Sequence, residues 1–553
     1  MQPMRTPLVA LLAGSLAACA SAPTPQTPAV VPPHVGAVAV EVPDISHPGG
    51  ETAAWWFRDG AAQAANRGSG QGRARNLILF VGDGMSLPTV AAARILDGQR
   101  KGRPGEGNRL AWEHFPQTAF SRTYNTDSQT PDSAGTMSAM ATGVKTRAGV
   151  ISIGQAPRRG DCAGALDAGM LTLWELAESA GMATGVVTTA RATHATPAAT
   201  FSHAADRNWE NDSQLPDAAK AAGCTDIARQ MIETPYGDGP DVLLGGGRTN
   251  FMPAAMPDPE YPGKAGRRED GRDLVAEWLA RHPGGSYAWN AAQFAAAPAD
   301  APLLGLFEPS HMHYEHDRAG DAAGEPSLAD MTRAAIERLS RDADGYVLLV
   351  EGARIDHAHH DGNAFRALDE TIALSEAVAV ADAMTSADDT LVLVTADHAH
   401  TMSFVGYPVR GNPILGKVME EGRDGAPEPA LDENGLPYTT LVYANGPGYV
   451  GAEGRPDLAA VDTAEPDYRQ EAIVPLGAES HGGDDVGIWA RGPDAAAVRG
   501  SVEQNAIFHF LLQASPRLRK AMCDNGYCDA NGIPTGLPDP AAFRAASPAP
   551  ATR

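Results

Sequence analysis

Basic residues, aromatic residues and cysteines are all scarce in this 553-residue sequence. Lys and Arg number 43 against 68 Asp and Glu, which gives a formal net charge of -25 at pH 7. This acidic balance argues against a nucleic-acid backbone as a specific partner and favours cations. Aromatic side chains make up 6% of the chain, there are five cysteines, and no internal repeat is visible. The length allows a sizeable core, in two to four domains or in one large α/β domain.

The amino-terminal apolar run, Leu8 to Leu16, is too short to span a bilayer. Arg5 precedes it, and the small-residue stretch "LAAC" follows it and ends in Cys19. Residues 1–19 resemble a bacterial lipoprotein signal peptide, in which Cys19 becomes the lipidated first residue; an ordinary secretory signal is the alternative. Both interpretations predict an exported protein of the cell envelope or periplasm, and the first predicts a lipid anchor in the membrane.

The four remaining cysteines suit two disulfides, because export places them in an oxidising compartment. They are Cys162, Cys224, Cys523 and Cys528. Of the three pairings, we favour Cys162–Cys224 with Cys523–Cys528, since the second pair lies in the short stretch "CDNGYC" and closes locally. No CxxC spacing supports the alternative of zinc bound by these thiols.

Composition divides the chain into a folded body and two irregular ends. Residues 20–50 are rich in proline and small residues and indicate an extended tether, and residues 541–553 indicate a disordered tail. In the body, 51–540, short apolar runs such as "NLILFV" and "TLVLVTA" alternate with helical patterns. This predicts an α/β fold with a large, mostly parallel sheet covered by helices on both faces. Residues 405–476 are rich in Gly, Pro and Asp and indicate a small inserted subdomain.

Carboxylates and histidines follow three of the predicted strands at the point where each strand ends. In open α/β sheets, ligands bind beyond the carboxyl ends of the strands, so these side chains are expected to converge on one site. Such mixed imidazole and carboxylate ligands suit zinc, whereas an all-oxygen set suits magnesium. The residues are Asp83; Glu351, Asp356 and His360; Asp397 and His398; with His481 just ahead of a further strand.

Helical spacing narrows the histidines of "VEGARIDHAHH" without deciding between the last two. If the chain turns helical after Ile355, His360 lies four residues from Asp356 and shares its face, while His359 lies three residues away and reaches the same face. His357 is disfavoured by this spacing. The residues alone therefore leave His359 and His360 as alternatives.

Ser133 opens a run of small residues with helical character, "PDSAGTMSAMATG". A serine at a helix start faces unsatisfied backbone N–H groups and the positive end of the helix dipole, which favour an oxyanion or a phosphate. An ordinary N-cap, provided by Ser or Asp, explains the same pattern. Both interpretations stay open from the residues alone.

The motifs taken together resemble the alkaline phosphatase family, and its animal-type branch in particular. The likeness extends from about Trp56 to Gln513 and is carried, in order, by "VGDGM", "PDSAGT", "TTARATHATPAATFSHAADRNW", "LFEPSHMHYE", "VEGARIDHAHH", "VTADHAHTMSF", "NGPGYV" and "SHGGDDVGIWARGP". It implies a metal-dependent hydrolase of small-molecule phosphate monoesters that acts through a phosphoserine and releases inorganic phosphate and an alcohol. A phosphodiesterase or sulfatase of the same superfamily, or a non-catalytic metal-binding surface lipoprotein, is the alternative.

The resemblance also implies roles for individual residues. Ser133 corresponds to the nucleophile and Arg207 to the phosphate-binding arginine, and His194 and His357 shape the phosphate and magnesium surroundings without being ligands. Two zinc ions and one magnesium ion are implied, with these ligands: Asp356, His360 and His481 for the first zinc; Asp83, Asp397 and His398 for the second; Thr196 and Glu351, with Asp83 bridging, for magnesium.

Three further features follow from the resemblance. A calcium site is implied at Glu260, Glu308, Glu325 and the carbonyl of Phe307, although Glu325 stands where the family usually has Asp; charged surface loops are the alternative interpretation. Residues 405–476 correspond to a crown-like subdomain near the interface of a homodimer. The family's disulfide pattern agrees with the pairing given above.

Overall fold

The computed structural model describes residues 37–43, 48–451 and 454–544. The predicted signal peptide with Cys19, most of the predicted tether and residues 545–553 of the predicted tail lie outside these ranges. Within them, no helix has both the length and the apolar character that a membrane crossing requires.

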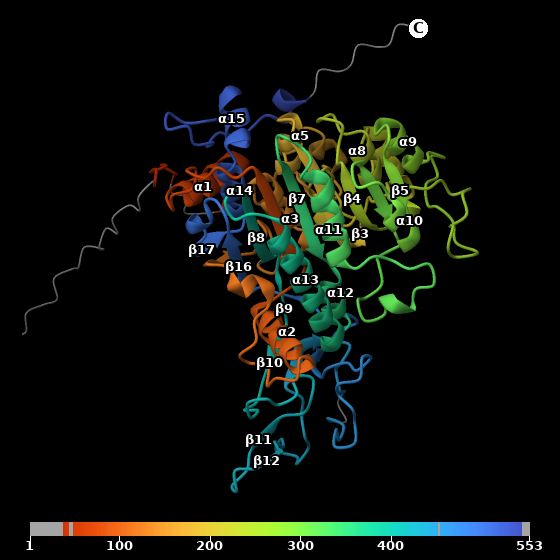
Figure 1. Ribbon diagram of the computed structural model, residues 1–553, viewed down its shortest axis with the longest axis vertical. Coiled ribbons are helices and arrows are strands. Elements are labelled where there is room, and N and C mark those ends of the chain that lie inside the picture. Colours follow the sequence, from red (N-terminus) through yellow and green to blue (C-terminus); the bar gives the residue numbers. More distant parts are fainter. Residues whose placement is uncertain (1–36, 44–47, 452–453, 545–553) are drawn as a thin grey trace, which may run out of the picture.

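Ten strands of the described chain form the central sheet (Figure 1). Only β16 among the ten runs antiparallel to its neighbours, and every other pairing is parallel. The predicted large, mostly parallel sheet is therefore confirmed. In spatial order the strands are β17 (Gly500–Glu503), β2 (Gln117–Arg122), β16 (Val486–Arg491), β8 (Thr390–Ala396), β1 (Asn76–Gly82), β7 (Tyr346–Gly352), β3 (Ala183–Arg191), β4 (Val242–Gly246), β6 (Leu303–Leu306) and β5 (Ser286–Ala288).

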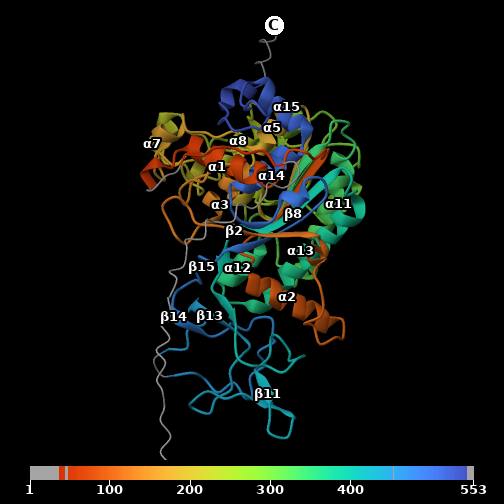
Figure 2. The ribbon, with the colours of Figure 1, turned by 90° about the vertical axis from the view of Figure 1, so that its left-hand side faces the viewer.

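Helices pack on both faces of this sheet and form two hydrophobic cores. Side chains alternate along β1, so Leu77 and Leu79 enter one core while Ile78 and Phe80 enter the other. Burying each such side chain contributes about 1.5–3 kcal/mol. In Figure 2 the two helical layers lie on opposite sides of the strands. The first layer contains α1 (Ala53–Ala65), α3 (Ser133–Thr142), α5 (Leu173–Ser179) and α14 (Ala506–Ala514); the second contains α2 (Leu87–Arg100), α11 (Leu328–Leu339) and α13 (Ala364–Met384).

Short helices occupy the connections between these elements. Most are capped by Asp, Asn, Ser or Thr side chains, as the N-cap preference predicts. They are α4 (Cys162–Ala165), α6 (Ala195–Ala198), α7 (Asp217–Ala222), α8 (Ile227–Ile232), α9 (Leu274–Arg281), α10 (Ala291–Ala296), α12 (Arg354–His360) and α15 (Pro516–Asp524).

The carboxyl ends of β1, β7 and β8 lie side by side. Strand β1 pairs with β7 on one side and with β8 on the other, and Gly82 at its end is opposite Gly352 and Ala396. Asp83 and Asp397 therefore leave the sheet at the same level, beside Glu351. This alignment assembles the polar site at one edge of the sheet, as the sequence pattern predicts.

The segment 405–476 departs from the layered body and projects at the lower end of Figure 1. Strands β13 (Leu441–Gly446) and β14 (Ala472–Pro475) form a three-stranded sheet with β10 (Met402–Phe404), and β11 (Met419–Glu421) pairs with β12 (Pro427–Pro429). Its described residues contain no helix.

Both predicted disulfides are present. Cys162, at the start of α4, is bonded to Cys224, which follows α7. Cys523, in the last turn of α15, is bonded to Cys528 across a local turn. The first bond joins segments 62 residues apart and the second closes a loop of 5.

Candidate active site

Ser133 is the first residue of α3, and its neighbour Asp132 caps that helix. The Asp132 carboxylate accepts hydrogen bonds from the backbone N–H groups of Gly135, at 3.1 Å, and Gly149, at 2.9 Å. The hydroxyl of Ser133 is therefore not needed as a cap. It lies 3.3 Å from Asp83 Oδ1 and 3.2 Å from His398 Nε2, within the buried polar site.

Asp356, His360 and His481 form a nearly equilateral triangle of ligand atoms. Asp356 Oδ1 is 3.3 Å from the Nε2 atom of each histidine, and the two Nε2 atoms are 3.2 Å apart. Tetrahedral zinc bonded at about 2.0–2.1 Å holds its ligand atoms about 3.3 Å from one another. The donor types and the spacing both fit a zinc ion.

A second group of ligand atoms belongs to Asp83, Asp397 and His398. His398 Nε2 is 3.3 Å from Asp83 Oδ1 and 3.3 Å from Asp397 Oδ2, and all three side chains are fully buried. Asp397 also accepts hydrogen bonds from Gly84 N–H and Thr136 Oγ1. Both distances from His398 match those of the first group, and this group offers two carboxylates and one imidazole where the first offers one carboxylate and two imidazoles.

Backbone carbonyls orient the three histidines. Nδ1 of His481 is 2.8 Å from the carbonyl oxygen of Pro131, Nδ1 of His360 is 2.5 Å from that of Glu479, and Nδ1 of His398 is 3.2 Å from that of Ala399. A proton on each Nδ1 leaves Nε2 as the free lone pair, which is how metal-binding histidines are usually held.

Both ring nitrogens of His359 contact residues outside the ligand groups. These contacts decide between His359 and His360, the two alternatives that helical spacing leaves open. Its Nε2 atom is 3.0 Å from Thr89 Oγ1 and its Nδ1 atom is 2.7 Å from the Tyr443 hydroxyl. Helix α12 does place Asp356 and His360 on one face. His359 therefore packs behind the site, and His360 faces it.

Three oxygens beside the second group have no hydrogen-bond partner among the described residues: Asp83 Oδ2, Thr196 Oγ1 and Glu351 Oε1. The other Glu351 oxygen accepts a hydrogen bond from Thr188 Oγ1 at 2.5 Å. Buried polar atoms are rarely left unpaired, since desolvation without a partner costs about 1–3 kcal/mol each. An all-oxygen set of this kind fits a magnesium ion.

The buried carboxylates repel one another and require positive charge. Burial raises the pKa of Asp83 well above its usual range, and Asp397 and Asp356 add to the shift. Burial also raises the pKa of Glu351 to about 8, although the hydrogen bond from Thr188 acts to lower it. At Asp356 burial acts in the same direction, but the neighbouring His360 and the hydrogen bond from His400 outweigh it and hold the pKa well below normal. Divalent cations would relieve this repulsion.

Arg207 reaches the site from the loop after α6 and is held at two points. Its Nη1 atom donates to Asp132 Oδ2 at 3.1 Å, and its Nη2 atom donates to His194 Nε2 at 3.0 Å. Burial lowers the pKa of His194 well below normal, with the Arg207 charge as the next cause, so His194 accepts this bond as a neutral ring. His357 lies beside it, with the ring centroids 5.6 Å apart.

Sequence reasoning missed His400 and Glu479, which support the first ligand group. His400 Nε2 is 2.8 Å from Asp356 Oδ1, and its Nδ1 atom contacts the Glu479 carboxylate. His400 follows His398 by two residues in "VTADHAH", on strand β9 (Ala399–His400). Spacing of two in extended chain places both histidines on one side, so this signal was available in the sequence.

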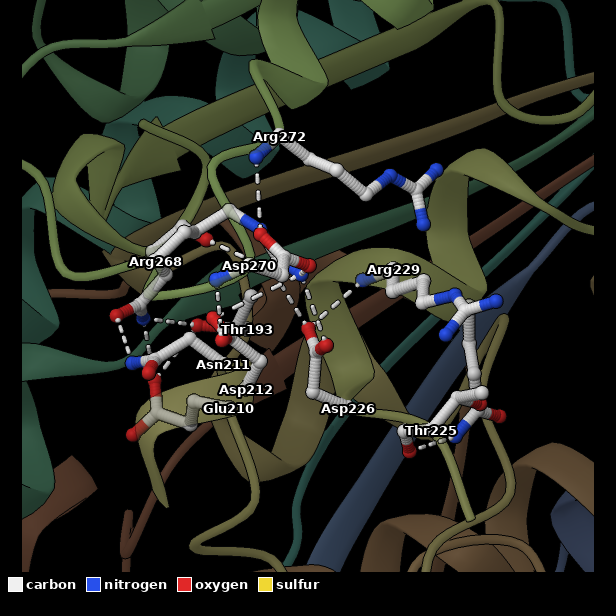
Figure 3. Close-up of polar contacts among 12 residues, drawn as sticks. Thr193, Glu210, Asn211, Asp212, Thr225, Asp226, Arg229, Arg268, Asp270 and Arg272 are labelled. Atoms are coloured by element: carbon white, nitrogen blue, oxygen red, sulfur yellow. Dashed lines mark hydrogen bonds and ion pairs between the residues drawn. The ribbon is translucent and has the colours of Figure 1, made fainter. Parts of the chain in front are cut away.

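A buried polar network, also missed, supports the segment that carries His194 and Thr196. Glu210 accepts hydrogen bonds from Thr193 Oγ1 at 2.6 Å and from Arg191 at 2.7 and 2.6 Å. Figure 3 shows this network continuing to the buried Arg268, which binds Asp226 at the start of α8. These contacts come from residues distant in sequence, and no local pattern marks them.

The residues of the implied calcium site lie between a buried guanidinium and a group of potential metal ligands. The buried Arg248 guanidinium donates to the Phe307 carbonyl oxygen at 2.6 Å and to Glu260 Oε2 at 2.6 Å. Glu308 and Glu325 lie together with His313 and Asp321, and Glu260 adjoins this group at Asp321.

Comparison with known proteins identifies the family of the chain. A family model described as alkaline phosphatase matches residues 74–516. The chain is 43% identical over 451 residues to an alkaline phosphatase of Gadus morhua, covering 80% of this chain and 92% of that protein. It is 44% identical over 457 residues to the tissue-nonspecific isozyme of Gallus gallus, covering 80% and 85%.

Solved structures show the same fold. Thermus thermophilus alkaline phosphatase matches with a TM-score of 0.57 and 27% identity, over 81% of this chain and 92% of that chain. The alkaline phosphatase from the Antarctic bacterium TAB5 matches with a TM-score of 0.53 and 19% identity, over 80% and 98%. The second likeness supports the fold alone.

Proposed function

Because the chain belongs to the alkaline phosphatase family and is a phosphomonoesterase, we propose that it acts through a phosphoserine formed at Ser133 beside two zinc ions and one magnesium ion. The resemblance predicted from the motifs is thereby confirmed at the level of family and activity. The ions, the nucleophile and the intermediate are the proposal.

The position of the Ser133 hydroxyl supports this proposal most directly. It lies between Asp83 and His398, at the amino end of a helix, with Arg207 anchored on the adjacent Asp132. A phosphate bound there would face backbone N–H groups, the positive helix end and a guanidinium that offers two parallel donors.

The two ligand triangles and the three unpaired oxygens would hold the ions. Asp356, His360 and His481 would bind the first zinc, Asp83, Asp397 and His398 the second, and Thr196 and Glu351 with Asp83 the magnesium. When bound, these ions supply a lowered pKa at the serine hydroxyl and charge stabilisation of the transferring phosphoryl group and the departing oxygen.

The chain's own residues account for positioning and proton movement. Ser133 Oγ forms a bond to phosphorus as the ester P–O bond opposite it breaks, and the alcohol departs with the proton that Ser133 gave up. Water then attacks the phosphoserine from the vacated side, which restores the hydroxyl and releases inorganic phosphate. Arg207 binds two phosphoryl oxygens throughout, and His194 keeps the guanidinium in place.

Trapping the intermediate tests the nucleophile. Wild-type protein quenched in acid after exposure to a ³²P-labelled monoester should carry label on Ser133, identified by peptide mass spectrometry. Ser133→Ala should lose turnover while its zinc content stays near wild type, because Ser133 is not a ligand of either triangle. Wild-type activity in the alanine variant would show that another residue is the nucleophile.

Substrate comparison separates this proposal from the related phosphodiesterases and sulfatases. We expect kcat/KM for p-nitrophenyl phosphate to exceed the values for bis-p-nitrophenyl phosphate and p-nitrophenyl sulfate. A faster diester or sulfate reaction would contradict a monoester site.

Metal removal tests the ions. EDTA should abolish activity, and zinc together with magnesium should restore it. Elemental analysis of purified protein should give at least two zinc ions and one magnesium ion per chain. Activity that survives complete loss of both metals would exclude this mechanism.

The amino terminus and the assembly are proposals of the same kind. We propose lipidation of Cys19 in the cell envelope, supported by the "LAAC" stretch; mass spectrometry of the mature amino terminus detects or excludes it.

We also propose a homodimer, supported by the exposed apolar side chains of the 405–476 segment described below.

A further inference from the structure

A separate group of potential ligands lies between β6 and α11. Atoms of Glu308, His313, Asp321 and Glu325 all come within 4.8 Å of one another, and none of the four belongs to the ligand groups around Ser133. The segment that carries them is mostly irregular between Leu306 and Leu328. Side chains from four points of one irregular loop thus converge.

Glu325 points a free oxygen into this group. Its side chain is fully buried, and Oε1 accepts a hydrogen bond from the His313 backbone N–H at 2.9 Å. Oε2 has no hydrogen-bond partner within the described chain, and the same holds for His313 Nδ1 and Asp321 Oδ2. Three buried atoms that could each bind a metal ion, and that have no hydrogen-bond partner among the residues described, therefore indicate a binding site for a cation.

The spacing fits a cation between these atoms. His313 Nδ1 is 3.5 Å from Glu325 Oε1 and 3.6 Å from Glu308 Oε1. These separations are too long for good hydrogen bonds. They are close to the roughly 3.3–3.5 Å between two ligands bonded to one ion at about 2.0–2.2 Å.

Charge favours the same conclusion. Burial raises the pKa of Glu325 to about 9, and the neighbouring Glu308 carboxylate adds to the shift. Burial likewise raises the pKa of Glu308 to about 7, with Glu260 as the next cause. A divalent ion would compensate these carboxylates, as buried like charges require.

The calcium set implied by the family resemblance does not fit this arrangement. The Arg248 guanidinium binds both Glu260 and the Phe307 carbonyl oxygen. Two of the four calcium ligands that the resemblance implies therefore already face a buried cation. His313 supplies an imidazole nitrogen instead. Calcium takes six to eight oxygen ligands, whereas one imidazole with carboxylates suits zinc.

We propose that Glu308, His313, Asp321 and Glu325 form a fourth metal site, which binds zinc rather than calcium. The ion ties the loop after β6 to the residues that precede α11. This site is distinct from the phosphomonoester site, and its occupancy does not depend on how Ser133 reacts.

Anomalous diffraction tests the proposal without any substitution. Crystals of the holoenzyme grown with equal zinc and calcium should give a difference peak among these four side chains above the zinc absorption edge and lose it below the edge. Calcium at this position, or no ion at all, would overturn the proposal.

Elemental analysis with matched variants provides an independent test. His313→Ala should lose one equivalent of zinc per chain relative to wild type, while His316→Ala, which removes an exposed imidazole three residues away, should keep the wild-type content. Hydrolysis of p-nitrophenyl phosphate by His313→Ala should persist, which separates this outcome from failure of the Ser133 site. Unchanged zinc in His313→Ala would contradict the assignment.

Discussion

At the amino end of α3, three side chains with different roles meet: Asp132, Ser133 and Arg207. Asp132 caps α3 and anchors Arg207, which leaves the Ser133 hydroxyl free for the proposed attack on phosphorus. Three neighbouring polar groups thereby give one oxygen a defined position and a cationic neighbour. Small changes at any of them should affect turnover more than folding.

Arg207→Lys tests the proposed binding of two phosphoryl oxygens by the planar guanidinium. Lysine keeps the charge but cannot donate both to Asp132 and to two phosphoryl oxygens. We expect kcat/KM for p-nitrophenyl phosphate to fall by about 10–100-fold, equivalent to about 1.4–2.7 kcal/mol, and inhibition by inorganic phosphate to weaken in parallel. Arg159→Lys, at an exposed pair with Asp206, is the control and should change neither.

Lys145 makes stability depend on pH. It is buried, donates to the carbonyl oxygens of Arg122 and Tyr124, and lies 2.7 Å from Glu503 Oε2. Burial lowers its pKa from 10.5 to about 8, with Glu503 opposing the shift. Between these values the unfolded chain binds a proton that the folded chain lacks, so the stability contributed by this site rises with pH.

We therefore expect the unfolding free energy of wild type, relative to Lys145→Met, to rise by up to about 3 kcal/mol from pH 8 to 10.5. Denaturant titrations across this range measure the difference. The exposed Lys520→Met is the matched control and should give a flat difference. A difference for Lys145 that falls with pH would contradict the assignment.

Among the elements, the three adjacent strands β1, β7 and β8 do most to build the site. Their ends are aligned by register, so each delivers its carboxylate at the same level without any long loop. Helix α12 then adds Asp356 and His360 on one face, one turn apart. Rigid elements, rather than flexible loops, therefore set the ligand spacing of about 3.3 Å.

The two disulfides should differ in what they contribute to stability. In the loop-entropy description, a crosslink over 62 residues contributes about 4 kcal/mol and one over 5 residues about 2 kcal/mol. Denaturation of the metal-loaded Cys162→Ala/Cys224→Ala and Cys523→Ala/Cys528→Ala variants compares them directly. A larger loss from the C-terminal pair would show that native packing, not chain entropy, dominates.

On the scale of the whole molecule, the projecting 405–476 segment exposes apolar residues that a monomer leaves uncovered. Tyr407 is 88% exposed and Ile473 is 76% exposed, with Val474 and Leu476 beside it. Ile473 and Val474 lie on β14, an edge strand of the small sheet. Exposed apolar edge strands commonly pair or pack with another chain.

Ile473→Asp should therefore weaken the proposed homodimer. A buried apolar anchor at an interface contributes about 2–4 kcal/mol to binding. We therefore expect the dissociation constant of the dimer to rise by about 30–1000-fold. Analytical ultracentrifugation measures the shift. Leu166→Asp, at an exposed leucine far along the chain from this segment, is the control. A monomeric wild type, or a variant that stays dimeric, would contradict the interface.

The sequence by itself determined the parallel sheet and the strand ends that carry Asp83, Glu351 and Asp397, and it favoured the cysteine pairing that the structure shows. These are local signals: apolar periodicity, a charged residue where a buried strand stops, and a short Cys–Cys spacing. The motifs also identified the family.

Tertiary structure decided the rest, because the deciding contacts join residues far apart in the chain. Tyr443 and Thr89 occupy both nitrogens of His359, which leaves His360 facing the site. Arg248 binds Glu260 and the Phe307 carbonyl, and His313 lies beside Glu308 and Glu325. Periodicity reports which face of an element a side chain occupies, but only packing determines which partner that side chain meets.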